Sequence, residues 1–158
     1  MKKYLRSPKV FLDDVDAKLL RILYEEARTS IADLARALSM SAPSVSERLK
    51  RLKESGVIER FTVEFDPTLI GYELAFYIRV SPLPGQLSKV VYVLQEIEEI
   101  VECDRITGDD CFIAKAYVRS AQEIEEVINR LIPYAKTNTS LVQSSPVSRR
   151  LPPLPRDE

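Results

Sequence analysis

One stretch of the sequence, SAPSVSERLKRLKESG at residues 41–56, constrains the fold more than any other. Its apolar residues recur at the spacing of one helix face. They are Ala42, Val45, Leu49 and Leu52. A helix here would start after Ser41, tolerate proline in its first turn and stop at Gly56. We therefore expect a short amphipathic helix whose outward face carries serines, a glutamate and several cations.

Two further helical patterns precede this stretch. Residues 14–27 carry an apolar stripe at helical spacing, and the aspartates at 13, 14 and 16 supply a cap and a negatively charged first turn. Ser30-Ile31-Ala32-Asp33 is typical of a capping box, which opens a short second helix. Ser39-Met40-Ser41 leaves only a tight connection between the second helix and the third.

Residues 57–65, VIERFTVEF, alternate apolar and polar side chains, which predicts a half-buried strand. Three helices with a tight turn before the third, followed by a strand, are typical of a winged helix-turn-helix. We expect this domain over residues 1–62, and a strand or linker over 63–72.

The third helix has the character of a DNA-recognition helix. Small hydroxyl side chains near its start could reach base edges, and its cations could contact phosphates and so position the helix. An ordinary solvated helix, with Glu47 paired to Lys50 or Arg51, is the alternative. The candidate DNA-binding residues are Ser30, Ser41, Pro43, Ser44, Ser46, Glu47, Arg48, Lys50 and Arg51.

In the second half of the chain the spacing of the apolar residues changes, and strand patterns alternate with helical ones. Strand patterns at 74–80, 100–107, 111–118 and 136–144 are interrupted by helical patterns at 86–97 and after a capping box at Ser120. The order βαββαβ is the ferredoxin-like split unit. The fold class is therefore α+β, with this second domain over residues 73–148 and a proline-rich tail over 149–158.

The composition excludes several function classes. The sequence has no histidine, which removes the commonest general base and the commonest transition-metal ligand, so we expect no enzyme, no cofactor and no metal site. It has no apolar run long enough to span a bilayer and no signal peptide, so we expect a cytoplasmic protein. The first 65 residues have a small net positive charge and the remainder a net negative charge.

The order of these motifs resembles the Lrp/AsnC family, the leucine-responsive or feast/famine transcription regulators. The resemblance covers roughly residues 11–145. It is carried by LDDVDAKLLRILYEEAR at 12–28, IADLARALSMS at 31–41, SAPSVSERLKRLKESGVI at 41–58, DPTLIG at 66–71 and TGDDCF at 107–112.

The resemblance implies a transcriptional regulator that binds double-stranded DNA at a pseudo-palindromic operator. It also implies that the second domain is a RAM/ACT-like domain through which the protein forms homodimers and then tetramers or octamers. An amino acid or related small molecule would bind near the 107–112 hairpin and switch assembly or DNA affinity. The implied effector-binding residues are Thr107, Gly108, Asp109, Asp110 and Cys111.

The hairpin departs from the family's usual TGDYDF, because Asp110 replaces the tyrosine and Cys111 the second aspartate. Asp109 and Asp110 are then the candidates for the carboxylate that binds a ligand's ammonium group, and the alternative is a simple polar turn in which Gly108 has positive φ. Two alternatives therefore stay open. One is a DNA-binding protein of this fold that senses no effector, and the other is a metabolite-binding module or small enzyme.

The two cysteines and the tail yield weaker expectations. If Thr107 pairs with Phe112, Cys103 faces a residue near 116, so we expect no disulfide to Cys111. We expect both cysteines to be buried structural thiols, with a redox role for Cys111 in the turn as the alternative. The tail LPPLPRDE is expected to be a disordered end or to lie against a neighbouring subunit, with docking of a polyproline-binding partner as the alternative.

Overall fold

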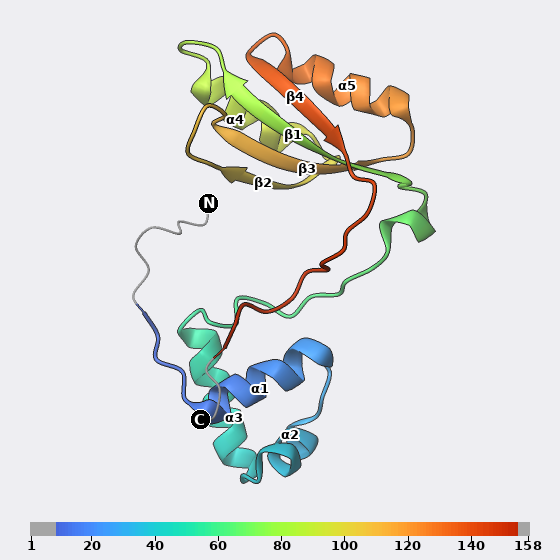
Figure 1. The fold of residues 1–158 in the computed structure, drawn as a ribbon. Coiled ribbons are helices and arrows are strands. Elements are labelled where there is room, and N and C mark those ends of the chain that lie inside the picture. The colour runs from blue at the N-terminus through green and yellow to red at the C-terminus, as the bar shows by residue number, and fades with distance from the viewer. Residues whose placement is uncertain (1–8, 155–158) are drawn as a thin grey trace. The chain divides into compact units, whose positions relative to one another are not determined.

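A computed structural model describes residues 9–154, which form two compact units (Figure 1). The first unit is the chain through Glu64 together with the segment from Ser148, and the second is Phe65–Val147. Residues 1–8 of the expected first domain and 155–158 of the expected tail lie outside the described residues. Each unit has its own hydrophobic core.

The first unit contains three helices, α1 (Asp14–Glu25), α2 (Ile31–Leu38) and α3 (Ala42–Glu54). Their apolar faces meet in one core, as the helical spacing predicted. The fully buried members of this core include Leu19, Leu34, Val45 and Leu52. Ala42 is exposed, so its place in the predicted stripe was wrong, because the core of this unit includes α3 residues only from Val45 onward.

Local backbone chemistry sets the ends of these helices. Asp13 caps α1 in a complete capping box with Asp16, and Ser30 caps α2 by accepting a hydrogen bond from the Asp33 N–H. Helix α2 ends at Ser39, which has φ 53°, and the following Met40 N–H donates to Ala35 O at 2.9 Å. This left-handed residue turns the chain sharply into α3, as a helix-turn-helix requires.

The strand predicted over residues 57–65 is not present. The structure assigns no strand there, because no other described segment pairs with it and a strand needs a hydrogen-bonding neighbour. Its outer alternating side chains stay exposed: Phe61 by 46%, Val63 by 81% and Phe65 by 67%.

The second unit has the predicted βαββαβ order. After a short 3-10 helix, η1 (Pro67–Ile70), come β1 (Leu74–Pro82), α4 (Leu87–Glu96), β2 (Ile100–Arg105), β3 (Phe112–Val118), α5 (Ala121–Leu131) and β4 (Ala135–Leu141). The strands form one antiparallel sheet in the order β2-β3-β1-β4. Helices α4 and α5 cover one of its faces, where Phe76, Ile78 and Val80 are completely buried (Figure 1).

The hairpin register corrects the predictions for the cysteines. Cys103 lies opposite Ala114 and Arg105 opposite Phe112, with an irregularity between Ile100 and Glu102 that shifts the pairing. Both cysteines are free, as predicted, but neither is buried: Cys103 is exposed because β2 is an edge strand, and Cys111 is half-buried. Although Cys103 is exposed, its sulfur is partly shielded from water, and this desolvation together with the neighbouring Asp104 charge raises the pKa of the thiol to about 11.

Among residues 9–154, no helix is both long enough and apolar enough to cross a membrane.

Candidate nucleic-acid interface and effector hairpin

The exposed start of α3 presents two serine hydroxyls side by side. Ser41 caps the helix by accepting a hydrogen bond of 3.3 Å from the Ser44 N–H. The two hydroxyl oxygens lie 2.7 Å apart, and both residues are exposed together with Pro43. A hydroxyl can donate and accept, so this turn offers polar contacts with no bulky side chain in the way.

Farther along α3, Ser46 and Lys50 line an open groove of about 360 Å³ on the side facing Ile31 at the start of α2. Lys53, Leu49 and Glu54 complete the lining. Lys50 makes one ion pair, to Glu54 at 3.9 Å, and both side chains are mostly exposed. An exposed pair of this kind contributes little to stability and is readily exchanged for another anion.

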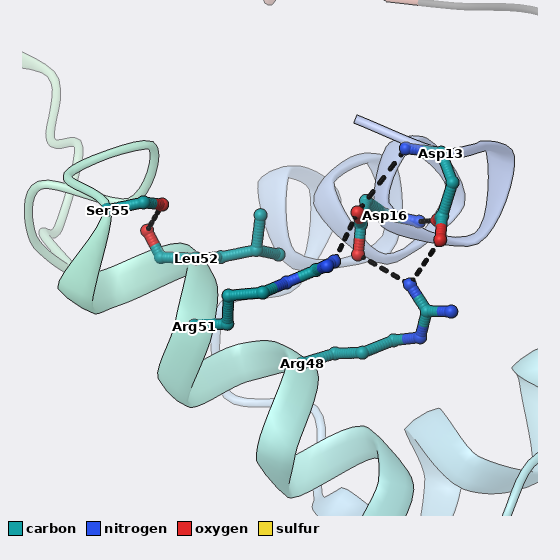
Figure 2. Close-up of polar contacts among 6 residues, drawn as sticks. All are labelled: Asp13, Asp16, Arg48, Arg51, Leu52 and Ser55. Atoms are coloured by element: carbon teal, nitrogen blue, oxygen red, sulfur yellow. Dashed lines mark hydrogen bonds and ion pairs between the residues drawn. The ribbon is translucent and has the colours of Figure 1, made fainter. Parts of the chain in front are cut away.

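The other two cations of α3 point back to α1 (Figure 2). Nη1 of Arg48 donates to Asp13 Oδ2 at 2.6 Å and to Asp16 Oδ1 at 2.9 Å, and Nη2 of Arg51 donates to Asp16 Oδ2 at 2.6 Å. Asp16 is only 1% exposed. We call these four residues, Asp13, Asp16, Arg48 and Arg51, the acidic clasp.

The charges of the acidic clasp stabilise one another. Partial burial works against ionisation of Asp13, but the hydrogen bond from the Asp16 N–H and the Arg48 guanidinium outweigh it and lower the pKa of Asp13. The hydrogen bonds to Asp13 and Asp16 raise the pKa of Arg48. The buried carboxylate is therefore paired with two guanidinium groups, which is the condition for burying a charge.

The acidic clasp was not predicted from the sequence. Asp13 and Asp16 have the pattern of capping residues, and Arg48 and Arg51 that of cations near the DNA backbone. One signal was available: both pairs are spaced by three residues, so each lies on one helix face and the two faces can meet.

Two further DNA-binding candidates, Ser30 and Glu47, make no hydrogen bond with the serine pair at the start of α3 among the described residues. Ser30 caps α2, and its hydroxyl also donates to an Asp33 carboxylate oxygen at 2.7 Å. Glu47 is exposed, and within residues 9–154 it makes neither of the ion pairs expected with Lys50 or Arg51. The expected pairs do not form because Lys50 turns to Glu54 and Arg51 to Asp16.

In the second unit, the effector candidates lie in the β2–β3 hairpin and at its junction with β1. Gly108 has φ 115°, a conformation that other residues rarely adopt. The Ser81 hydroxyl contacts Asp110 Oδ1 at 2.8 Å, and Arg79 Nε lies 3.9 Å from Asp110 Oδ2. Asp110 is therefore tied to β1, whereas the side chains of Thr107 and Asp109 are exposed.

Two neighbours complete the surroundings of this hairpin. Cys111 donates its N–H to Val80 O at 3.1 Å and packs its side chain against the core of the sheet domain. Arg79 also donates to the Asn138 side chain on β4 at 2.7 Å. Asp109 is thus the hairpin carboxylate with no side-chain contact within the described residues. In that part of the chain, no group of three His, Cys, Asp or Glu side chains could hold a metal ion.

Two family models match the chain. Residues 12–59 match the model described as winged helix-turn-helix DNA-binding, and residues 75–152 match the Lrp/AsnC ligand binding domain. The two matches correspond to the two units of the structure.

Curated relatives match over most of their length. The chain is 29% identical over 133 residues to the HTH-type transcriptional regulator LrpC of Bacillus subtilis, covering 84% of this chain and 92% of LrpC. It is 30% identical over 118 residues to the HTH-type transcriptional regulator FL11 of Pyrococcus furiosus, covering 75% of this chain and 78% of FL11.

Solved structures of such regulators share the fold. The structure of B. subtilis LrpC superposes with a TM-score of 0.84 at 28% identity, over 89% of this chain and all of LrpC. A feast or famine regulatory protein from M. tuberculosis complexed with L-methionine superposes with a TM-score of 0.82 at 26% identity, over 89% of this chain and 98% of that one.

Proposed function

The chain belongs to the Lrp/AsnC family of transcriptional regulators, and we propose that it binds its operator with the exposed face of α3. The observation that carries this proposal is the pair of exposed hydroxyls on Ser41 and Ser44 at the start of the third helix, which directly follows the helix-turn-helix turn. In this motif the N-terminal residues of that helix face the base edges of the major groove.

The roles divide along the helix. Ser41, Pro43, Ser44 and Glu47 meet bases or sugars near the start of α3, while Ser46 and Lys50 flank the groove and contact phosphates. Ser30, at the start of α2, contacts the DNA backbone beside them. Arg48 and Arg51 hold α3 against α1 through the acidic clasp.

Selection of binding sites from a pool of random duplexes tests this proposal. We expect wild-type protein to enrich one site and the Ser44→Ala variant to lose about 0.5–1.5 kcal/mol of discrimination at a single base position, because a serine hydroxyl makes one hydrogen bond to a base edge. Ser88→Ala, which removes an exposed serine hydroxyl from α4 of the other unit, is the matched control. Failure of wild-type protein to enrich any site would contradict the proposal, as would a Ser44→Ala profile identical to the control.

The protein acts as a homodimer that assembles further into a tetramer or octamer. The sheet face opposite α4 and α5 carries Tyr77, which is 40% exposed, and Lys115, which lies over the rings of Tyr77 and Tyr117. Pairing of this face between two protomers covers the tyrosine rings and supports a pseudo-palindromic operator with half-sites about one helical turn apart. Sedimentation of wild-type protein and of Tyr77→Asp tests this, since a monomeric wild-type protein would contradict it.

An amino acid or related small molecule binds at the β2–β3 hairpin, at Thr107, Gly108, Asp109, Asp110 and Cys111. The likeness to a regulatory protein complexed with L-methionine supports this assignment. The free carboxylate of Asp109 is the better partner for a ligand's ammonium group, because Asp110 already contacts Ser81.

A thermal-shift screen against the amino acids and their common breakdown products tests for this effector. We expect a stabilising ligand whose effect is lost in Asp109→Ala and reduced in Asp110→Ala. If no compound shifts the wild-type protein, the alternative function is favoured, which is a repressor or architectural DNA-binding protein of the same fold that needs no effector.

The protein works in the cytoplasm and catalyses no reaction. Relatives that are transcriptional regulators support this assignment, as does a sequence with no histidine to serve as a general base.

A further inference from the structure

Helix α3 carries four cations, and the two lysines have different surroundings from the two arginines. Lys50 and Lys53 line the open groove, and Lys50 has only an exposed and long ion pair with Glu54. Arg48 and Arg51 are bound to the buried carboxylate of Asp16 at 2.9 and 2.6 Å. Two of the four positive charges are therefore neutralised on the α1 side of the helix (Figure 2).

We propose that Asp16 is a specificity-determining residue, because it withholds Arg51 from the phosphate backbone and so limits binding that does not depend on sequence. The inference rests on the proposed DNA-binding function. It concerns Arg51 more than Arg48, since the Arg51 side chain is 55% exposed and that of Arg48 only 24%.

Arg51 could pair either with Asp16 or with a phosphate of the DNA backbone. Asp16 is 1% exposed, and an ion pair to a buried carboxylate is screened far less by water and salt than a contact to an exposed phosphate. The Arg51–Asp16 pair therefore persists when DNA approaches. Each phosphate contact adds affinity for every sequence equally, so withholding one lowers non-specific binding while the serines still read the bases.

Removing the Asp16 carboxylate should release Arg51 while Arg48 stays paired. In Asp16→Asn, Arg48 keeps its 2.6 Å contact with Asp13, so no buried arginine is left without a partner. Arg51 is then free to contact a phosphate, and the plot of log affinity against log salt should steepen by roughly 0.9 for each helix bound. A fourfold rise in salt would then cost this variant, for each helix bound, about 3.5-fold more affinity than the control loses.

Asp14→Asn is the matched control. It removes an exposed carboxylate from α1, the same helix that carries Asp16, and leaves the acidic clasp intact. We expect Asp16→Asn to bind random-sequence duplex more tightly than Asp14→Asn does. The ratio of operator affinity to random-duplex affinity should be lower for Asp16→Asn than for Asp14→Asn.

A second pair of variants keeps the test informative if Asp16→Asn does not fold. Arg51→Gln leaves Asp16 paired with Arg48, and it should bind DNA with the wild-type salt dependence because Arg51 contacts no phosphate. Lys50→Gln should make that dependence shallower by roughly 0.9 for each helix bound.

Different results would contradict this inference and the proposed DNA-binding function. The inference is overturned if Arg51→Gln weakens the salt dependence as much as Lys50→Gln does, or if Asp16→Asn binds random-sequence duplex no more tightly than Asp14→Asn does. Wild-type protein whose DNA affinity does not depend on salt would instead overturn the proposed function itself.

Discussion

The hydroxyl of Ser81 on β1 lies 2.8 Å from the carboxylate of Asp110 in the β2–β3 hairpin. Ser81 also contacts the Asp109 carbonyl oxygen at 3.3 Å, so one side chain ties the hairpin to a central strand of the sheet. The two neighbouring aspartates of the GDD turn consequently have different roles: the Asp110 carboxylate supports the hairpin and that of Asp109 remains available.

This difference predicts unequal effects of two otherwise identical substitutions. Asp110→Ala should destabilise the second unit by about 1 kcal/mol, because it removes a partly buried hydrogen-bond partner. Asp109→Ala should change stability by less than about 0.5 kcal/mol. Amide hydrogen exchange of β3 measures the effect on this unit alone, and equal effects of the two variants would contradict the division of roles.

The acidic clasp predicts a large stability loss when Arg48 is removed. Within residues 9–154, Arg48→Met leaves the buried Asp16 with Arg51 as its one side-chain partner and Asp13 with none. Breaking a buried ion pair costs about 3–5 kcal/mol, and we expect the lower end because Arg51 remains. Amide hydrogen exchange of α1 and α3, measured over a range of urea concentrations, gives this loss of stability. Arg36→Met, which replaces an exposed arginine of α2, is the control. A loss below about 1 kcal/mol would show that the clasp contributes little.

The lowered pKa of Asp13 predicts a pH dependence of the first unit. Because the folded-state pKa lies below the unfolded value of about 3.9, the stabilisation is fully present above that value. It is lost as the pH falls through the lower, folded-state pKa. Asp13→Asn should therefore flatten the acid limb of the stability curve for α1–α3, whereas Asp14→Asn, outside the clasp, should not. The result that contradicts this is an acid limb that Asp13→Asn leaves unchanged.

The C-terminal segment provides a further test. The Tyr24 hydroxyl on α1 donates a 2.5 Å hydrogen bond to Arg149 O, and Leu151 and Leu154 are half-buried. Tyr24→Phe removes only the hydroxyl, so we expect a loss of about 0.5–1 kcal/mol and faster proteolysis after Arg149 and Arg150. Tyr92→Phe, which alters an exposed tyrosine of α4, is the control. Equal cleavage rates in wild-type and both variants would exclude docking of this segment on α1.

The sequence predicted the elements whose pattern is local. The three helices, the βαββαβ order and the helix caps at Ser30 and Ser120 follow from spacing and capping chemistry within a few residues, and the structure confirms them. The prediction of a strand at 57–65 was wrong. Alternation of apolar and polar residues shows which side chains could share a buried face, but a strand also needs a second strand to hydrogen-bond with, and the pattern says nothing of that.

The candidate site was harder to predict because it depends on contacts between helices. Nothing local distinguishes Lys50, which faces the groove, from Arg51, which reaches Asp16 thirty-five residues earlier. The burial of Asp16 could not be predicted either, because an aspartate in the first turn of a helix is usually exposed to solvent. The roles of the individual DNA-binding and effector-binding residues stay predictions.

The central claim is that the chain reads a DNA sequence with α3, and one comparison of affinities tests it most directly. Wild-type protein is titrated against the duplex obtained by selection and against a scrambled duplex of equal length and composition, over a range of salt concentrations. The account predicts that the selected duplex binds at least about 10³-fold more tightly, and that log affinity falls linearly with log salt for both. Equal affinity for the two duplexes, or affinity that does not change with salt, would contradict it.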